Sequence, residues 1–321
     1  MFYSIRHVTR FRYSAEVSES IMEVRMQPRS DTSQRCLSFQ LSVTPRTRVT
    51  HHRDYLGNTV HHFDVPGGHT QLIILAEALV DVQLPQSLPY SLPDAAWDDL
   101  DLTVNAGDFW DMLQPSQYSK PTPALIDLAK KLGVERRSNP LQFLRELNTS
   151  MFHWFDYVPQ STKVDSPIDE AIEARKGVCQ DFAHIMIALC RYVGIPARYV
   201  SGYLFHRSVD HDRSSDGATH AWVEAFLPGL GWIGLDPTNN LIVGERHVRT
   251  AMGRDYADVP PTRGVFKGNA EQALSVSVHV AQSDSLPPLD EEIIMSDEDW
   301  SVFQTDQDEM LAAQQQAQQQ Q

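Results

Sequence analysis

Cysteine is scarce in this sequence: there are three, and none forms a Cys-x-x-Cys pair. That number excludes a disulfide framework and a structural zinc site, because both need several closely spaced cysteines. No apolar run approaches the roughly 18 residues of a membrane-spanning helix, and the first residues lack the apolar core of a signal peptide. We therefore expect a globular, cytoplasmic protein that does not bind a membrane.

Positive charge is scarce as well. The sequence has 27 Lys and Arg against 42 Asp and Glu, a formal net charge of −15. Because it has no basic patch, the chain is not expected to bind nucleic acid. A glycine-rich phosphate loop is also missing, so no nucleotide is expected. Nothing in the sequence predicts a flavin, a metal ion or another cofactor.

Residues 284–321 form a tail with ten acidic residues and no Lys or Arg, and the tail ends in a glutamine-rich run. This composition is typical of disordered chain. Two interpretations of the tail are open. It either keeps the protein soluble, or its segment 293–303, which mixes acidic with large apolar side chains, docks onto a protein partner.

Alternating apolar residues dominate the first quarter of the chain and predict strands. The strand-like runs cover residues 2–13, 21–27, 37–43, 58–65 and 71–82. We expect an antiparallel β domain over 1–83, a connector with several prolines over 84–120, an α+β core with C-terminal strands over 121–283, and the tail over 284–321. Helices are predicted near 122–133, 139–154 and 167–175.

Apolar residues recur three and four positions apart over residues 182–193 and predict a helix with one apolar face. Gly194 ends this helix, and Pro196 prevents it from continuing. Cys179 stands in the first turn, after the pair 177–178. Aligned backbone amides in a first turn, like a neighbouring imidazolium, favour the reactive thiolate form of a cysteine. Cys179 is therefore a candidate nucleophile.

Residues 220–226 and 232–236 flank a turn-rich Leu-Pro-Gly-Leu-Gly stretch and predict an antiparallel hairpin. If Phe226 pairs with Trp232, small apolar residues of both strands share one face. His220 and Asp236 then lie together on the other face, about 7–8 Å apart along a diagonal. A shift by one residue would separate them. His220 is therefore the candidate base, and Asp236 is the residue that orients it.

Competing interpretations apply to the other cysteines and histidines. Cysteine is among the most often buried residue types, and we interpret Cys36 and Cys190 as structural. His184 follows Cys179 by five residues, about 140° around the helix, which makes it a poor base. The polar stretch 206–217 predicts a mobile loop whose histidines are candidates for contact with a substrate.

Four histidines, at positions 51, 52, 61 and 62, flank a predicted turn at 54–58. Their number suggests a metal cluster, but adjacent residues on a strand point to opposite faces. A solvated hairpin is therefore favoured over a metal site.

Several blocks of the sequence together resemble bacterial transglutaminase-like proteins. They are Gly-Val-Cys-Gln-Asp-Phe-Ala (177–183), Gly-Ile-Pro-Ala-Arg-Tyr-Val-Ser-Gly-Tyr (194–203), His-Ala-Trp-Val-Glu (220–224) and Leu-Asp-Pro-Thr (235–238). The N-terminal third, with Ile-Arg-His-Val-Thr-Arg-Phe-Arg-Tyr (5–13) and Asp-Tyr-Leu-Gly-Asn (54–58), resembles the small β domain that precedes the core in this family. The resemblance implies a papain-like core with Cys179 as nucleophile, His220 as base and Asp236 as orienting residue. It leaves the reaction open, since relatives include transglutaminases, peptidases and amidases.

The expected reaction is acyl transfer through a thioester. Cys179 attacks a carboxamide of a protein or peptide substrate, and His220 protonates the departing amine. The acyl group then passes to a second amine or to water. The alternatives are a cysteine peptidase or amidase of the same fold and, in another class, a non-catalytic scaffold that binds proteins.

A developing oxyanion needs hydrogen-bond donors, and the backbone amide of Cys179 is the first candidate. The candidates for the second donor are Tyr157, Trp154 and Gln180. Gln180 is the weakest of these because it adjoins Cys179. Trp222 and Trp232 are candidates for the walls of the substrate cleft, although packing against the helix is the simpler interpretation. The sequence carries no signal for an oligomeric state.

Overall fold

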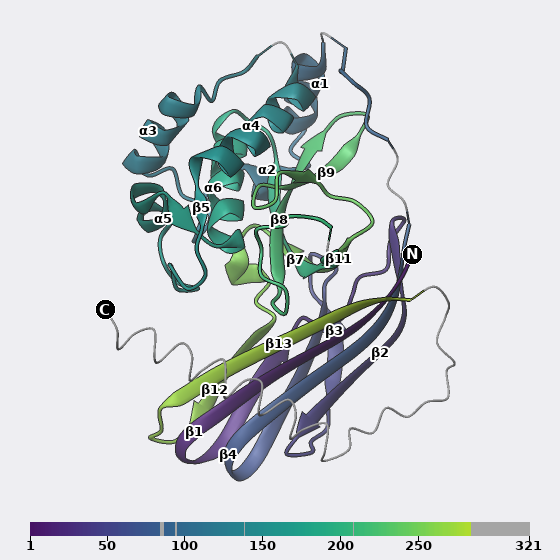
Figure 1. The fold of residues 1–321 in the computed structure, drawn as a ribbon, viewed down its shortest axis with the longest axis vertical. Coiled ribbons are helices and arrows are strands. Elements are labelled where there is room, and N and C mark those ends of the chain that lie inside the picture. The colour runs from purple at the N-terminus through teal and green to yellow at the C-terminus, as the bar shows by residue number, and fades with distance from the viewer. Residues whose placement is uncertain (84–86, 94, 138, 208, 284–321) are drawn as a thin grey trace. The chain divides into compact units, whose positions relative to one another are not determined.

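The structure, a computed structural model, describes residues 1–283 except for 84–86, 94, 138 and 208. Antiparallel β sheets and a group of helices form a mixed α+β architecture (Figure 1), which confirms the predicted fold class. The predicted acidic tail, 284–321, lies outside the described residues, so both interpretations of it stay predictions. None of the described helices is long and apolar enough to cross a membrane.

The N-terminal β domain is a sandwich built largely from two long strands. Its first strands are β1 (Phe2–Val24), β2 (Gln34–Thr44), β3 (Thr50–Arg53) and β4 (Thr59–Val82). β1 and β4 pair along most of their length, and both fold back on themselves (Figure 1). The pairing register in β1 shifts between Arg12 and Glu19, where bulges let a strand bend sharply. The two halves of each strand therefore belong to two facing layers.

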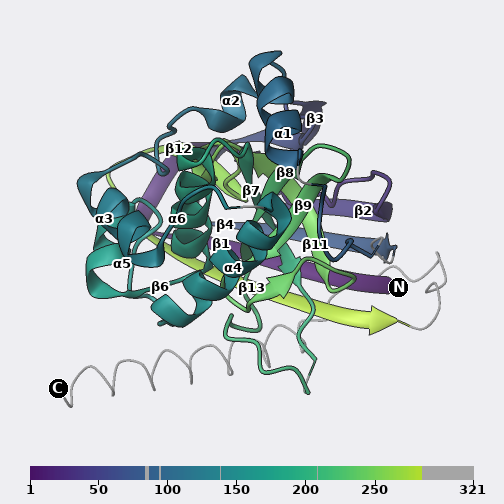
Figure 2. The ribbon, with the colours of Figure 1, turned by 90° about the horizontal axis from the view of Figure 1, so that it is seen from above.

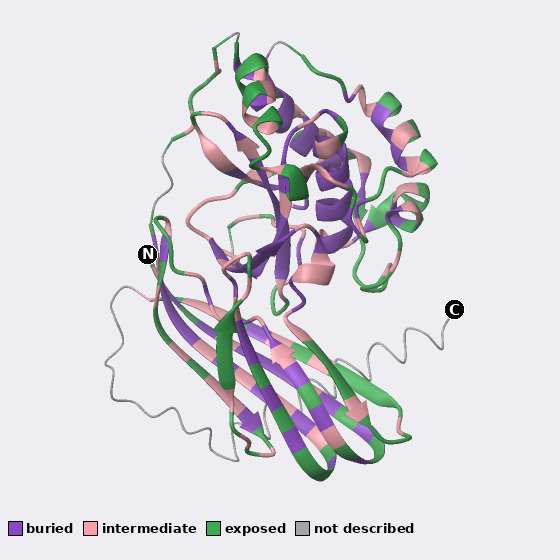
Figure 3. Ribbon diagram, turned by 180° about the vertical axis from the view of Figure 1, so that it is seen from behind, coloured by how far each residue is buried: buried purple, intermediate pink, exposed green. Residues whose placement is uncertain are grey.

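Apolar side chains from both layers meet between them. Phe11 and Ile74 come from one layer, Met22 and Phe63 come from the other, and all four are buried in one cluster. Buried and accessible residues alternate along much of these strands (Figure 3), as the two-residue period of a strand requires. The alternating apolar residues that predicted these strands therefore also form the core of the sandwich.

The last two strands join this sandwich. β12 (Thr262–Lys267) and β13 (Gln272–Ser283) pair with opposite halves of β1, for example Val265 with Ile21 and Val278 with His7. From the sequence these strands were expected in the 121–283 core, and the sheet pairing differs from that grouping. Strand propensity is a local property, whereas the partners here lie more than two hundred residues apart in the chain. The boundaries at 83 and 120 stay predictions.

The predicted connector contains two helices, α1 (Ala96–Asn105) and α2 (Trp110–Leu113). Trp97 in α1 packs against the helical core, and Phe109 packs against Phe226 with 4.1 Å between the ring centroids. Three helices follow close to their predicted positions: α3 (Pro123–Leu132), α4 (Pro140–Trp154) and α5 (Ile168–Ala174). Thr122 caps α3 by accepting the N–H of Leu125, and proline occupies the first helical position.

The helix α6 (Cys179–Tyr192) lies against a five-stranded sheet. The strands are β7 (Ala197–Leu204), β8 (His220–Leu227), β9 (Gly231–Asp236), β10 (Leu241–Ile242) and β11 (His247–Gly253), in the order β10-β9-β8-β7-β11. α6 packs on β7 and β8, while α3, α4 and α5 pack on α6 (Figure 2). A parallel pair, β5 (Asp156–Tyr157) and β6 (Lys176–Gly177), leads into α6, and a short 3-10 helix (Tyr256–Asp258) follows β11. Residues 180–190 of α6 are all buried (Figure 3), so the start of α6 is held rigidly.

Candidate active site

Cys179 is the first residue of α6, and it is half-buried. Asp181 organises this helix start: its Oδ2 accepts a hydrogen bond of 2.8 Å from the N–H of Val178 and one of 2.6 Å from the hydroxyl of Thr162. Gly177 is needed here, because a Cβ at this position would come within 2.8 Å of the Asp181 carboxylate. Cys179 therefore lies at the positive end of a firmly anchored helix dipole.

The hairpin of β8 and β9 has the predicted register, with Phe226 opposite Trp232. His220 begins β8 and Asp236 ends β9. Their side chains are buried, and His220 Nε2 lies 2.8 Å from Asp236 Oδ2. The contact that the register predicted is therefore present, while the catalytic roles of these residues stay predictions.

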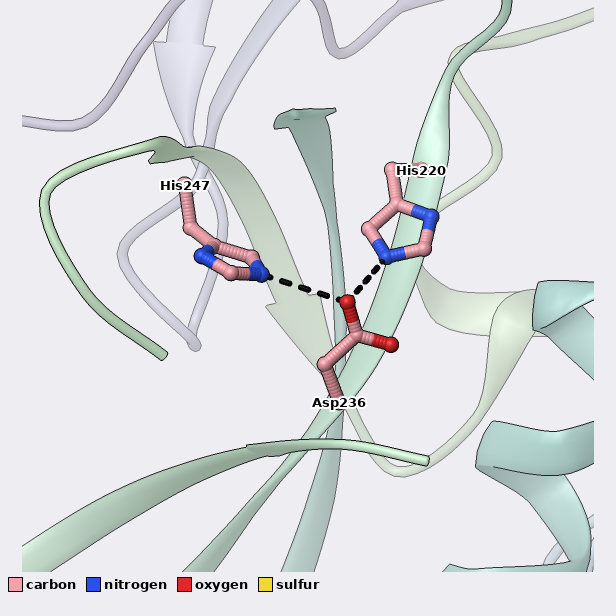
Figure 4. Close-up of side chains that lie close together, drawn as sticks. All are labelled: His220, Asp236 and His247. Atoms are coloured by element: carbon pink, nitrogen blue, oxygen red, sulfur yellow. Dashed lines mark hydrogen bonds and ion pairs between the residues drawn. The ribbon is translucent and has the colours of Figure 1, made fainter. Parts of the chain in front are cut away.

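The Asp236 carboxylate accepts hydrogen bonds on both oxygens. Oδ1 accepts the backbone N–H groups of Thr238 (3.0 Å) and Asn239 (3.2 Å). Oδ2 accepts from His220 and from His247 Nε2 (3.3 Å) (Figure 4). It also accepts from Asn239 Nδ2 at 2.9 Å. Burial alone would raise the pKa of Asp236, but His220 and His247 outweigh burial and lower that pKa below its usual range. Asp236 is therefore ionised and fixed in orientation.

The imidazole of His220 has one nitrogen for each of its two neighbours. Nε2 is bonded to Asp236, whereas Nδ1 is buried without a hydrogen bond of ordinary geometry. Burial lowers the pKa of His220, but Asp236 and the nearby Cys179 side chain raise it, and the net result is a pKa of about 10. His220 is therefore protonated at neutral pH, with Nδ1 as the nitrogen available to Cys179.

Tyr157 is the predicted second oxyanion donor that lies close to the nucleophile. Burial raises the pKa of Tyr157, and the Cys179 side chain adds to that rise. The Tyr157 hydroxyl lies 3.3 Å from Ser215 Oγ and accepts the N–H of Ser215 at 3.4 Å. Tyr157 lies in β5 and Ser215 lies in the loop that precedes β8, so their contact joins this loop to β5.

The other two candidates for the second donor make different contacts. Gln180 Nε2 donates to the carbonyl oxygen of Val164 at 2.8 Å. The Trp154 ring lies beneath the guanidinium of Arg175, 4.3 Å from the ring centroid. The donor N–H of Gln180 is therefore occupied, and the assignment of the second oxyanion donor to Tyr157 or Trp154 stays a prediction.

The two tryptophans of the hairpin have different surroundings. Trp222 is fully buried in a cluster with Val200 and Met252, and its ring centroid lies 6.0 Å from that of His220. Trp232 packs on Phe226 and lies beneath the Arg198 guanidinium, 4.0 Å from the ring centroid. Only packing contacts are seen for both rings among the described residues, so a role in the substrate cleft stays a prediction.

His184 is bonded to a residue outside the triad, and His206 and His211 lie in the loop that precedes β8. His184 accepts the N–H of Tyr256 at 3.1 Å and packs between tyrosine rings, and burial lowers its pKa to about 3. His206 Nδ1 lies 3.2 Å from Asp212, and His211 is exposed in the same loop. Their predicted contact with a substrate stays a prediction.

The turn at 54–58 is present, with Asp54 Oδ1 accepting the N–H groups of Leu56 and Asn58. His51, His52 and His62 are exposed, as a solvated hairpin requires. His61 is the exception, because it is buried against Phe39 with 5.1 Å between ring centroids. Burial and the nearby His51 lower its pKa to about 4.

Two residues of the site, His247 and Asn239, were not predicted from the sequence. Asn239 directly follows the Leu-Asp-Pro-Thr block, so its position near Asp236 was a usable signal. His247 lies on β11, a strand with no local feature that connects it to β9. His220, Asp236 and His247 have ligand atoms within 4.8 Å of one another, a spacing that a metal ion accepts. Hydrogen bonds to one shared carboxylate oxygen already account for that spacing (Figure 4).

A helix that begins at a cysteine and packs on an antiparallel sheet carrying a histidine and a carboxylate defines the papain-like class of cysteine-enzyme fold. Residues 3–81 match the family described as the bacterial transglutaminase-like N-terminal region, and residues 127–237 match the transglutaminase-like superfamily. The chain therefore belongs to the transglutaminase-like superfamily, which confirms the resemblance seen in its motifs.

Three similar proteins illustrate the range of this superfamily. A crystal structure from Cytophaga hutchinsonii, provisionally assigned as a cysteine protease, superposes with a TM-score of 0.68 at 27% identity and covers 89% of this chain and 93% of that one. An uncharacterised protein of Mycobacterium leprae is 32% identical over 281 residues, 86% of this chain and 97% of that protein. Protein-glutamine gamma-glutamyltransferase of Pseudomonas aeruginosa is 29% identical over 133 residues, 40% of this chain and 20% of that protein. These likenesses support an enzyme of the transglutaminase-like kind without specifying its reaction.

Proposed function

We propose that this chain is a Cys-His-Asp enzyme that transfers acyl groups from protein or peptide carboxamides through a thioester. One observation carries the proposal. The buried His220 imidazole is bonded through Nε2 to an ionised Asp236, while its Nδ1 is left for the side chain of Cys179, which lies at the start of a helix. A thiol beside an imidazolium and a helix N-terminus favours the thiolate form that attacks carbonyl carbons.

The proposed reaction has two steps. The Cys179 sulfur bonds to the carboxamide carbon, the carbon–nitrogen bond breaks, and the proton on His220 Nδ1 leaves with the departing amine. In the second step an amine attacks the thioester, His220 takes its proton, and the carbon–sulfur bond breaks to free Cys179. Asp236 holds the imidazole in the required orientation and stabilises its protonated form.

A cysteine peptidase or amidase is the second candidate, because water in place of the amine gives hydrolysis. The whole-chain likeness to the provisionally assigned cysteine protease favours it, whereas the partial likeness to the gamma-glutamyltransferase favours transfer. Incubation with a glutamine-containing peptide and a labelled primary amine distinguishes them by mass spectrometry. We expect amine-linked peptide; cleaved chains, or a peptide in which the glutamine has become glutamate, would by themselves assign the protein to hydrolysis.

The first test is the rate at which iodoacetamide labels Cys179 as a function of pH, followed by mass spectrometry in wild type and His220→Ala. Cys36 and Cys190 are internal references, because burial raises their pKa to about 11 and about 12. We expect fast labelling of Cys179 near pH 6 that falls at least about a hundredfold in His220→Ala. Labelling that begins only near about pH 8.5 and does not depend on His220 would instead indicate the non-catalytic scaffold.

A further inference from the structure

His247 is bonded to Asp236, yet the mechanism described for the triad does not use it. Its Nε2 lies 3.3 Å from Asp236 Oδ2, the oxygen that also accepts from His220 (Figure 4). The two histidines approach this oxygen from different strands, His220 from β8 and His247 from β11, which are separated in the sheet by β7. All three side chains are buried, so this contact is protected from water.

The surroundings of His247 make it a hydrogen-bond donor to Asp236. Burial lowers the pKa of His247, against the opposing effect of Asp236, and therefore favours the neutral ring. The backbone N–H of Gly244 donates to Nδ1 at 3.4 Å. A neutral imidazole that accepts at Nδ1 carries its hydrogen on Nε2, the nitrogen that faces Asp236. The Trp222 ring packs edge-on against His247, with 5.2 Å between centroids, and fixes the plane of the imidazole.

Side chains of the β domain hold the strand that carries His247. β11 is an edge strand, and two buried amides bond its backbone as a neighbouring strand would. Gln34 bonds both the N–H and the carbonyl oxygen of Arg249, each at 2.9 Å. Asn58, from the turn at 54–58, bonds both backbone groups of Met252, also at 2.9 Å each. The position of β11 is therefore set from the β domain.

We propose that His247 is a positioning residue of the triad and that the β domain fixes it in place through β11. The inference rests on the proposed function. His247 and His220 hold the same carboxylate oxygen from different sides (Figure 4), so Asp236 keeps its orientation while His220 gives up and regains its proton. Small displacements of a reacting group are costly, about a hundredfold for 1 Å.

The variants His247→Ala and His247→Gln test this role. The Gln amide can donate to Asp236 and still accept from Gly244, so it is the conservative replacement. We expect His247→Ala to slow Cys179 labelling near pH 6 at least about tenfold and His247→Gln to recover most of that loss. In His247→Ala the downfield NMR resonance of the His220 Nε2–H, which reports the bond to Asp236, should also broaden or shift.

Two further variants separate positioning from a general loss of stability. Leu128→Ala removes a buried side chain from α3 and leaves the packing around His247 intact, and His279→Ala removes an exposed histidine from β13. Both should keep the His220 resonance of the wild type. A His247→Ala protein that is labelled at the wild-type rate, with an unchanged His220 resonance, would overturn the role of His247.

The part played by the β domain is tested with Asn58→Ala, or with Gln34→Ala if the first variant does not fold. Each should slow Cys179 labelling, and adding His247→Ala should slow it no further than His247→Ala alone, because both changes act on one contact. Fully additive losses would refute transmission through β11. If wild-type labelling does not depend on His220, the proposed function fails, and the His220 resonance alone then decides whether His247 positions Asp236.

Discussion

Asp236 shows how much of the site depends on one atom, because its Oδ2 accepts three side-chain hydrogen bonds. In Asp236→Asn, the Oδ1 of the new amide can still accept the backbone N–H groups of Thr238 and Asn239. Its NH₂ group then faces the donors of His220 and His247. We expect turnover to fall roughly 10²- to 10⁴-fold.

The same substitution changes the titration of His220. The Asp236 carboxylate favours the protonated imidazole, so its removal lowers the pKa of His220 from about 10 towards the ordinary value of about 6.5. The fraction of imidazolium between about pH 7 and pH 9 should therefore fall, which an NMR titration measures directly. Asp127→Asn, at an exposed carboxylate on α3, is the control. An unchanged His220 titration would contradict the assigned ion pair.

Tyr157 is the second residue whose role can be measured alone. If its hydroxyl stabilises the oxyanion, Tyr157→Phe should lower kcat about 10²- to 10³-fold and change KM little. Ser215→Ala is the matched control, because it removes the hydroxyl that lies beside Tyr157 and leaves the Tyr157 hydroxyl in place. Equal small effects of both substitutions would show that Tyr157 only ties the loop before β8 to β5.

Close packing between strands brings the elements of the site together, and Gly202 marks a point of very close approach. It pairs with His220 across β7 and β8. A Cβ at this position would overlap the Val248 carbonyl oxygen of β11 and come within 2.6 Å of the Trp222 ring.

Gly202→Ala should therefore lower the free energy of unfolding by about 1–3 kcal/mol through overpacking, measured by chemical denaturation. Gly244→Ala is the control, because the nearest neighbour of its added Cβ is 3.9 Å away. Equal unfolding free energies for the two variants would show that β7 and β11 can separate at little cost.

Elements defined by local signals were predictable from the sequence. The apolar periodicity and the Gly194 stop predicted α6, and the turn-rich stretch between β8 and β9 fixed the register that joins His220 to Asp236. These signals span fewer than about 20 residues, the range over which periodicity and turn chemistry act.

Elements defined by distant partners were not predictable. The sequence predicts that residues near 262–283 form strands but not that they pair with β1, because edge selection depends on the finished sheet. His247 was missed for the same reason: its contact with Asp236 exists only once β11 has paired with β7. Gln34 and Asn58 are ordinary polar residues until β11 lies beside them.

At the scale of the whole molecule, the chain leaves the β sandwich after β4, forms the helices and the second sheet, and returns to the sandwich with β12 and β13. The sandwich is therefore complete only when β12 and β13, the last described strands, have paired with β1. A buried cluster of residues from β1, β4, β13 and the second sheet, including Tyr3, Val80, Tyr203 and Val278, joins the two sheets. The β domain and the core are thus expected to unfold as one cooperative unit.

Two truncations test this dependence. A chain that ends at Asp284 retains β12 and β13 and should keep the thermal midpoint and the Cys179 labelling rate of the full chain. A chain that ends at Pro261 removes both neighbours from the outer edges of β1 and leaves unpaired backbone that favours aggregation. We expect it to lose cooperative unfolding and His220-dependent labelling together, measured by calorimetry and mass spectrometry. Labelling that survives removal of the two strands would show that the core positions the triad without a closed β domain.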